Sequence, residues 1–487
     1  MTDAEYLEWL SSESAIKCVL LEVGVSISGV GSTVYLSNRG YTTSPTDSPA
    51  NTNYLPVVRG GLEMSSELSL QGDPSISWGD IAVLNYNGER DDWLNYTWKN
   101  REIKVFLGDV TWARGLFREV FTGRLEDLTA QDRDTLNLKI RDKTEGLNTS
   151  LTETKLGGTT ANKEKILPLC FGECHNIEPL LTNPVTLEYQ VHAGPIERFI
   201  EVRDNGVPVT FSGNLSTGKF TLANSPLGTI TASVQGAKPD VYRNTVGSLV
   251  KHIAKTYGKY PLTDSDIDLT NFSDFETANP QPVGVYLSEK ANVMVVMSEL
   301  AKSVGAQAVM GPDGKLRMLK VALPSATFSR EIRPEHIKEK SLTVNRKIDV
   351  VAAVSINYCR NYTVQENLQS ALPPEHTTLF AQEWLEANAS DATVAANYGL
   401  TGQVEKQPTA LLVTTDAQAE ASRRLAIYKV QRYVYSLEAN LGLMLVNLGD
   451  YVRIFNPRFG FSSGKIGQVV STKVDWFTNS VTLEVLV

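Results

Sequence analysis

Residues 166–209, with the sequence ILPLCFGECHNIEPLLTNPVTLEYQVHAGPIERFIEVRDNGVPV, form the stretch that decides which fold the sequence predicts. The stretch contains two of the four cysteines and two of the five histidines of the chain. Leu187, Tyr189 and Val191 alternate with polar residues, a pattern typical of a strand with one buried face. The same stretch thus carries both candidate chemical groups and a β pattern.

Two turn signals flank this β pattern. Pro168 lies inside the apolar run 166–172, and proline in such a run predicts an edge strand or a bend. Asn205 and Gly206 precede the segment VPV, and both residues tolerate the positive φ of a tight hairpin turn. The stretch therefore predicts a strand, a loop and a hairpin, with the cysteines and histidines on the loop.

The whole chain has the composition of an ordinary globular protein. Its 487 residues suffice for three or four domains of roughly 100–200 residues each. Hydrophobic residues make up 42% and charged residues 21% of the chain, so a sizeable core is expected. The formal net charge is −9 and the isoelectric point is near 5.3. This acidity argues against general nucleic-acid binding, although a local basic patch is compatible with it.

The sequence predicts neither secretion, nor a membrane span, nor a disulfide scaffold. The N-terminus is acidic, whereas a secretory signal begins with a basic region. Every apolar run is shorter than the roughly 20 residues of a membrane helix. Four scattered cysteines in 487 residues do not form a disulfide framework. We therefore expect synthesis in a reducing cytoplasm.

The N-terminal part, residues 1–148, predicts a β barrel or sandwich. A short helix is expected at 3–12, and the sequence that follows has a β pattern. Apolar and polar residues alternate there in short segments that are separated by Gly and Pro. The predicted strands are 19–25, 31–36, 62–70, 81–86, 103–107, 119–125 and 135–140.

The rest of the chain predicts three further domains. Residues 149–240 form a small β domain, and residues 241–346 form an α+β domain with helices near 246–257 and 288–305 and a hairpin at 312–314. Residues 347–487 contain helices at 383–396 and 416–431 and a closing β barrel. The basic side of 416–431 suits an acidic partner or solvent. The predicted fold class is α+β, multidomain and β-rich, with two or more barrel or sandwich domains and a small α+β domain between them.

The order of these segments resembles one protein family. The segments PLCFGECHNIEPLL and YQVHAGPIERFIEVRDNGVPV, followed by the closing LGDYVRI and GQVVSTKVD, resemble central hub proteins of the tail tip or baseplate of tailed bacteriophages. These hubs are related to the hub of gene transfer agents and to the hub of contractile baseplates. The resemblance covers the first, middle and last parts of the chain and contains no catalytic motif.

The resemblance implies a virion structural protein that is made in the host cytoplasm and carried at the phage tail tip. Such a hub is a homotrimer, and its two barrels per subunit form a pseudo-sixfold ring. The hub would join the tail tube and the distal tail protein to tail fibre or spike proteins, and it would also meet the tape measure protein. Stable nucleic-acid binding is not expected, although DNA would pass through the lumen. The position at the tip implies a part in host attachment.

Cys170 and Cys174, followed by His175, are the candidate metal ligands. Zinc ligands occur at spacings of two to four residues, but a zinc site needs a second pair of ligands. Cys18 and Cys359 are the only other cysteines. Some tail-tip proteins that resemble this family carry an iron–sulfur cluster on cysteine thiolates, so the resemblance admits such a cluster on all four. The alternative is that these residues are buried free thiols and that no cofactor is bound.

Residues 90–98 form a candidate ligand loop. Asp91, Trp93 and Trp98 combine a carboxylate with aromatic faces, as sugar-binding platforms do. The alternative is a packed loop between two strands. If the loop binds a ligand, the protein would be a carbohydrate- or receptor-binding tail protein rather than a hub.

Catalysis is not predicted. The sequence contains no HExxH, no GxxxxGK that is followed by Ser or Thr, and no GxGxxG followed by an acidic residue. His175 and His192 lie 17 residues apart without an evident nucleophile. The enzymatic alternative is a tail-associated cell-wall hydrolase, but every segment is already assigned to barrel or α+β structure. We therefore expect a protein without enzymatic activity.

Overall fold

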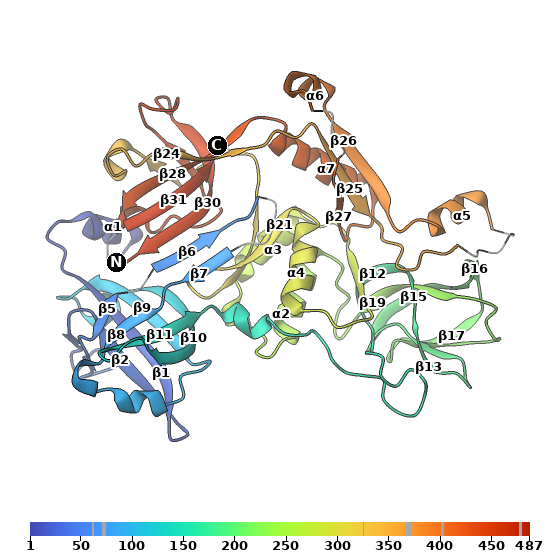
Figure 1. The fold of residues 1–487 in the computed structure, drawn as a ribbon, viewed down its shortest axis with the longest axis horizontal. Coiled ribbons are helices and arrows are strands. Elements are labelled where there is room, and N and C mark those ends of the chain that lie inside the picture. The colour runs from blue at the N-terminus through green and yellow to red at the C-terminus, as the bar shows by residue number, and fades with distance from the viewer. Residues whose placement is uncertain are drawn as a thin grey trace. The chain divides into compact units, whose positions relative to one another are not determined.

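The computed structural model describes residues 1–60, 63–70, 75–324, 326–366, 368, 370, 372–400, 404–476 and 480–487. Short strands outnumber helices and form several sheets (Figure 1), so the α+β, β-rich, multidomain class is confirmed. The chain divides into two compact units. The first contains Met1–Glu145, Val309–Ile348 and Gln431–Val487, and the second contains Gly146–Ala308 and Asp349–Val430. The four predicted domains, 1–148, 149–240, 241–346 and 347–487, stay a prediction.

The N-terminal part of the first unit forms a seven-stranded sheet with the order β2-β1-β9-β10-β11-β8-β5. Alternate residues of β11 are buried, which is the pattern that the sequence predicted. The predicted first helix is α1 (Asp3–Ser11), and Thr2 and Glu5 cap its start. The strands are β1 (Lys17–Ile27), β2 (Val30–Ser37), β5 (Val58–Gly60), β8 (Ile81–Leu84), β9 (Glu102–Asp109), β10 (Arg118–Ala130) and β11 (Thr135–Arg141).

The C-terminal part of the first unit contributes four strands of an eight-stranded sheet, and residues 330–348 contribute two. Its main path is β23 (Arg330–Ile332), β29 (Tyr451–Ile454), β30 (Lys465–Asp475), β31 (Ser480–Leu486), β28 (Arg432–Asn440) and β24 (Thr343–Ile348). Two further strands of this sheet, β6 and β7, come from early in the chain. β6 (Glu63–Glu67) pairs with β30, and β7 (Ser75–Trp78) pairs with β6 (Figure 1). The strand predicted at 62–70 is thus found as β6, and Leu62 lies outside the described residues.

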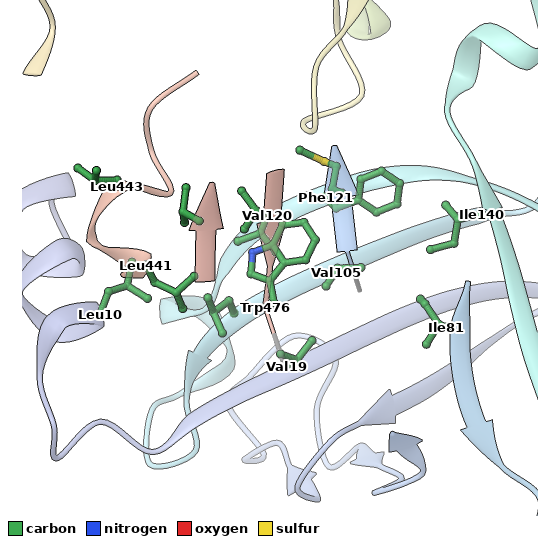
Figure 2. Close-up of a cluster of buried hydrophobic side chains, with 14 of the residues drawn as sticks. Leu10, Val19, Ile81, Val105, Val120, Phe121, Ile140, Leu441, Leu443 and Trp476 are labelled. Carbon is green, nitrogen blue, oxygen red and sulfur yellow. The ribbon is translucent and has the colours of Figure 1, made fainter. Parts of the chain in front are cut away.

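Both sheets of the first unit contribute to one hydrophobic cluster. Its members include Val19 and Val105 from the N-terminal sheet and Leu441, Leu443 and Trp476 from the C-terminal part. Figure 2 shows these side chains together, with Leu441 next to Leu10 of α1. The two ends of the chain therefore share a single core, and neither sheet can bury its inner face without the other.

In the second unit, residues 166–209 contribute strands to two small sheets. One has the order β16-β15-β19-β12-β20, and the other has the order β13-β14-β18-β17. The strands of the first sheet are β12 (Leu169–Ile177), β15 (Ile196–Asp204), β16 (Val207–Pro208), β19 (Ile230–Ala237) and β20 (Gly284–Leu287). Those of the second are β13 (Leu180–Asn183), β14 (Glu188–Gln190), β17 (Phe211–Asn214) and β18 (Lys219–Leu222).

The hairpin predicted at Asn205 and Gly206 is confirmed, because β15 pairs with β16 across these two residues, which have φ of 45° and 84°. Of the edge strand or bend predicted at Pro168, the edge strand is wrong. β12 begins at Leu169, directly after the proline, and pairs with β19 on one side and β20 on the other. Because Pro168 precedes the ladder, its missing N–H costs the sheet no hydrogen bond.

The helices of the second unit match the predictions in part. α2 (Val246–Thr256), α4 (Val293–Lys302) and α7 (Thr414–Tyr428) lie where helices were expected, whereas α3 (Leu269–Ala278) and α5 (Pro374–Phe380) were not predicted. The helix predicted at 383–396 is wrong over its first part and is found only at its end, from Ala392. This segment forms β26 (Leu385–Ser390), which pairs with β25 (Ala353–Tyr358), and then α6 (Ala392–Tyr398). Asp391 accepts hydrogen bonds from the N–H groups of Thr393 and Val394, so the helix begins after it.

A hairpin was predicted at 312–314. β21 (Ala306–Met310) and β22 (Leu316–Lys320) form a two-stranded sheet around this turn, and Gly314 has a φ of +66°.

Within the described part of the chain, no helix has the length and apolar character needed to cross a membrane.

Candidate functional site

Strand β12 carries the candidate metal ligands of the sequence. Cys170 and Cys174 are buried in the apolar core of the small β sheets, at 0% and 1% exposure. They were predicted on a loop, and this is wrong, because both residues pair with neighbouring strands. Gly172, between them, has a φ of +68°, and a Cβ there would overlap the carbonyl oxygen of Val283. The glycine therefore lets β12 bend while its backbone stays in contact with β20.

The two thiols of β12 lie within hydrogen-bonding reach of each other. Burial raises the pKa of the Cys174 thiol well above its usual value, and the hydrogen bond with Cys170 raises it further. The Cys174 thiol also donates to the carbonyl oxygen of Phe171, 3.8 Å away. Cys174 is therefore protonated at neutral pH and is a poor nucleophile and metal ligand.

The remaining two cysteines, Cys18 and Cys359, lie in different units of the chain. Cys359 belongs to the second unit, whereas Cys18 belongs to the first, where burial raises its pKa to about 12. Among the described residues, no group of three or more His, Cys, Asp and Glu side chains is placed to hold a metal ion. Cys170 and Cys174 would supply two of the four thiolates that an iron–sulfur cluster uses, and the cluster stays a prediction.

The two histidines of the stretch lie in different surroundings. His175 Nε2 contacts Oε1 of Glu173 at 3.2 Å, and this contact lowers the pKa of the glutamate. His192 is buried, and its Nδ1 accepts a hydrogen bond from the backbone N–H of Cys170 at 3.0 Å. Burial, with a smaller effect of His252, lowers the pKa of His192 to about 4. His192 is therefore neutral. Its hydrogen bond joins β12 to the loop that follows β14 (Glu188–Gln190), which is a structural role.

The candidate ligand loop includes the short 3-10 helix η2 (Asp91–Asn95). Trp98 is 1% exposed, and its indole N–H donates to the carbonyl oxygen of Trp93 at 2.8 Å. Asp91 accepts a hydrogen bond from the Asn85 amide at 2.7 Å. Trp98 thus belongs to the core of the first unit, whereas Trp93 is only partly buried. Ligand binding by Asp91, Trp93 and Trp98 stays a prediction, and the geometry also gives this loop a packing role.

A buried ionic cluster in the first unit was not anticipated from the sequence. Glu22 of β1, Tyr54 of β4 (Asn53–Tyr54) and Arg114 of the 3-10 helix η3 (Arg114–Leu116) are joined by hydrogen bonds. Burial raises the pKa of the Tyr54 hydroxyl, which therefore stays protonated and donates to Glu22. The three residues lie 32 to 92 positions apart in the sequence, so no local spacing pattern indicates the cluster.

The basic side of the helix predicted at 416–431 has an internal partner. Glu420 of α7 is buried, and its carboxylate accepts hydrogen bonds from the guanidinium groups of Arg423 and Arg424, each at 2.7 Å. Arg424 also donates to the carbonyl oxygen of Lys302 at 2.6 Å. These arginines therefore stabilise the second unit. The i,i+3 and i,i+4 spacing from Glu420 is the sequence signal that indicates this pairing.

Comparison with known proteins gives structural matches. Neither a family model nor a curated protein matches the sequence. A tail protein from Neisseria meningitidis is 10% identical, with a TM-score of 0.41, over 96% of this chain and 96% of that chain. The 43 kDa tail protein of a Shewanella oneidensis prophage is 10% identical, with a TM-score of 0.39, over 96% of this chain and 98% of that chain.

A chain of the native gene transfer agent virion is 11% identical, with a TM-score of 0.44, over 68% of this chain and 87% of that chain. In all three matches, about nine of ten aligned residues differ. The matched chains are two tail proteins and a chain of a gene transfer agent virion, and each match has a TM-score below 0.5.

Proposed function

We propose that this chain is a virion structural protein and forms the central hub of a phage tail tip or baseplate. One observation supports this proposal above all. The first unit combines a seven-stranded and an eight-stranded sheet around one shared apolar cluster, and the two ends of the chain supply most of the strands. The sequence resemblance implies two barrels per subunit, and these two sheets are the elements that would form them.

Three copies of such a subunit would present six similar β bodies around one axis. This arrangement would match a sixfold tail tube on one side and a threefold tip on the other, since closed rings are built by repeating one interface. The proposed partners are the distal tail protein, the tape measure protein and a tail fibre or spike protein. The function of the protein would then depend on the shape of its interfaces with these partners.

We also propose that the protein has no enzymatic activity. The Cys174 thiol is protonated, His192 is neutral, and the carboxylate of Glu420 is occupied by two arginines. These groups are engaged in holding the fold and are not poised for acid–base or nucleophilic chemistry. Purified protein should leave the turbidity of bacterial cell walls unchanged, and clearing of the walls would point to the hydrolase alternative.

The copy number in purified particles tests the hub proposal. Quantitative mass spectrometry against the major tail-tube protein should give about three copies per particle, as expected for one closed trimer. Six or more copies would favour a ring or fibre component. Absence from the particle would remove the virion role altogether. Sedimentation of the purified chain then tests the trimer directly, since a monomer at micromolar concentration would contradict it.

A further inference from the structure

One edge of the eight-stranded sheet carries a cluster of cations and aromatic rings. We call it the Arg–Phe surface and define it by Arg333, Arg453, Phe455, Arg458, Phe459 and Lys465. Two guanidinium groups lie near one ring, because those of Arg453 and Arg333 are 4.9 and 5.4 Å from the centroid of Phe455. The guanidinium of Arg458 is 5.7 Å from the centroid of Phe459. These contacts hold the arginines in defined positions beside aromatic faces.

The strand register explains why these side chains face outward. β23 runs parallel to β29, with Ile332 beside Ile454. Both isoleucines are buried in the core of the first unit. Because side chains alternate between the two faces of a strand, Arg453 and Phe455 of the same segment must point away from that core. Both are only partly buried.

The loop between β29 and β30 presents Phe459 to solvent. The loop is held by hydrogen bonds from the N–H of Asn456 to the carbonyl of Phe461 and from the N–H of Gly464 to the same carbonyl, at 3.2 and 3.0 Å. Phe459 is 40% exposed and has a φ of +55°, a region that bulky residues rarely adopt. Backbone strain of this kind concentrates at functional positions. The loop thus maintains an exposed aromatic ring at an energetic cost.

The charge of this surface is opposite to that of the protein as a whole. The chain carries a net charge of −9, whereas the Arg–Phe surface carries four cations. In the described part of the chain, Arg333 pairs with Glu331 at 2.7 Å, and Arg453, Arg458 and Lys465 have no carboxylate partner. Arg453 donates to the carbonyl oxygen of Ser463 at 3.2 Å, which leaves further guanidinium N–H groups for an external anion.

We propose that the Arg–Phe surface binds single-stranded nucleic acid. Cations along a backbone path, with exposed aromatic rings on which bases stack, are the two elements that single-strand binding requires. Arg453, Arg458 and Lys465 would contact phosphates, and Phe459 would stack on a base. The bases of a duplex already stack on one another, so they would not be available to stack on the exposed ring of Phe459. This inference is independent of the proposed hub function.

The small number of cations makes the expected binding weak and sensitive to salt. Each phosphate contact with a single strand contributes about −0.7 to the slope of log K against log salt. Three unpaired cations therefore predict a slope of about −2. A fourfold rise in salt should weaken binding roughly 15-fold. This agrees with the acidity of the chain, which argues against stable, general nucleic-acid binding.

Fluorescence anisotropy of a labelled oligo(dT) of about 20 nucleotides with the full-length chain tests the proposal. We expect saturable binding at low salt. Arg453→Gln and Arg458→Gln should each make the salt slope shallower by about 0.7. Phe459→Leu should weaken binding severalfold while the slope stays unchanged, because it removes stacking and retains the charges. The matched control is Arg346→Gln on β24 of the same sheet, where Arg346 lies 3.4 Å from Glu67, and it should bind as the wild type does.

Several results would overturn this inference. One is the absence of saturable oligo(dT) binding at low salt by wild-type protein that is shown to be folded. Another is equal binding by the wild type and by the Arg453→Gln, Arg458→Gln and Phe459→Leu variants. Tighter binding to a duplex of the same length would exclude the single-strand assignment. Retention on polyglutamate, with no binding to oligo(dT), would instead identify the surface as a contact for an acidic protein.

Discussion

Arg114 donates hydrogen bonds from Nε and Nη2 to Oε1 of Glu22, at 3.2 and 2.7 Å. The hydroxyl of Tyr54 donates to the same oxygen at 2.6 Å, and the guanidinium lies 3.6 Å from the ring centroid of Phe106. The backbone N–H of Arg114 also donates to the carboxylate of Asp47 at 3.2 Å. The cluster therefore ties the polar loop 42–53 to the N-terminal sheet, and this loop has little apolar surface of its own to bury.

Replacing Arg114 by Met should destabilise the first unit. The substitution leaves the carboxylate of Glu22 partly buried without its cation, and loss of one partner of a buried pair costs about 3 kcal/mol. Because the Glu22 side chain is 22% exposed, we expect a value at or below this figure. A lower midpoint in urea unfolding and faster proteolysis in the loop 42–53 should report the loss.

Two further variants make this prediction specific. Arg118→Gln removes an exposed pair with Asp3, whose side chain is 72% exposed, and should change stability by less than about 1 kcal/mol. The double variant Glu22→Leu/Arg114→Met removes both charges and should recover much of the lost stability. An unchanged midpoint for Arg114→Met alone would show that the ionic cluster contributes nothing to the fold.

The stability of the second unit should fall in acid because of His192. The pKa of this buried histidine is about 4, against an ordinary value of 6.5. As pH falls below 6.5, the unfolded chain binds a proton here that the folded protein does not bind until about pH 4. Over this difference of about 2.5 pH units, at about 1.4 kcal/mol each, stability should decrease by up to about 3 kcal/mol.

The variant His192→Asn isolates this effect. The amide oxygen of Asn can accept the hydrogen bond from the Cys170 N–H, but Asn does not titrate. The variant should therefore lose less stability than the wild type between pH 6.5 and pH 4 in thermal unfolding. His376→Asn, on α5, is the control and should follow the wild-type curve. Parallel curves for wild type and His192→Asn would assign the acid sensitivity to other groups.

Alternation along single strands was the part of the fold that the sequence could predict. Leu136, Leu138 and Ile140 are buried on one face of β11, as their spacing indicates. Pairing between distant segments has no such local signal. Thr472 of β30 lies beside Ser66 of β6, about four hundred residues earlier in the chain. The division into two interleaved units follows from such long-range pairing and was therefore not predicted.

The candidate site shows the same limit. Cys170 and Cys174 could be recognised from sequence as a pair, but their burial depends on β19 and β20, which come from other parts of the chain. The segment 385–390 has residues with high helix propensity, yet it pairs with β25 because tertiary contacts override weak local preferences. The spacing of Arg423 and Arg424 from Glu420 indicates their pairing, but the burial of Glu420 is a property of the folded unit and was not predicted.

The close approach of β12 and β20 gives a further prediction. A Cβ at Gly284 would overlap the carbonyl oxygen of Glu173. Gly284→Ala should therefore separate the two strands and cost on the order of 3 kcal/mol or more, since backbone atoms cannot yield as a flexible side chain can. Loss of soluble protein or a much lower unfolding temperature would report this. Gly31→Ala, on β2, is the control, because a Cβ there meets no atom within 4 Å.

The ligand loop gives the last prediction, in which two tryptophans of one loop behave differently. Trp98 is 1% exposed and is part of the core of the first unit. Trp98→Ala should therefore lower stability by about 3–5 kcal/mol and reduce particle assembly. Trp93 is only partly buried, so Trp93→Ala should assemble. Adsorption of these assembled particles to host cells then decides the role of the loop. Normal adsorption would show that the loop only packs against the first unit. Loss of adsorption by otherwise intact particles would show that the exposed part of Trp93 binds a receptor.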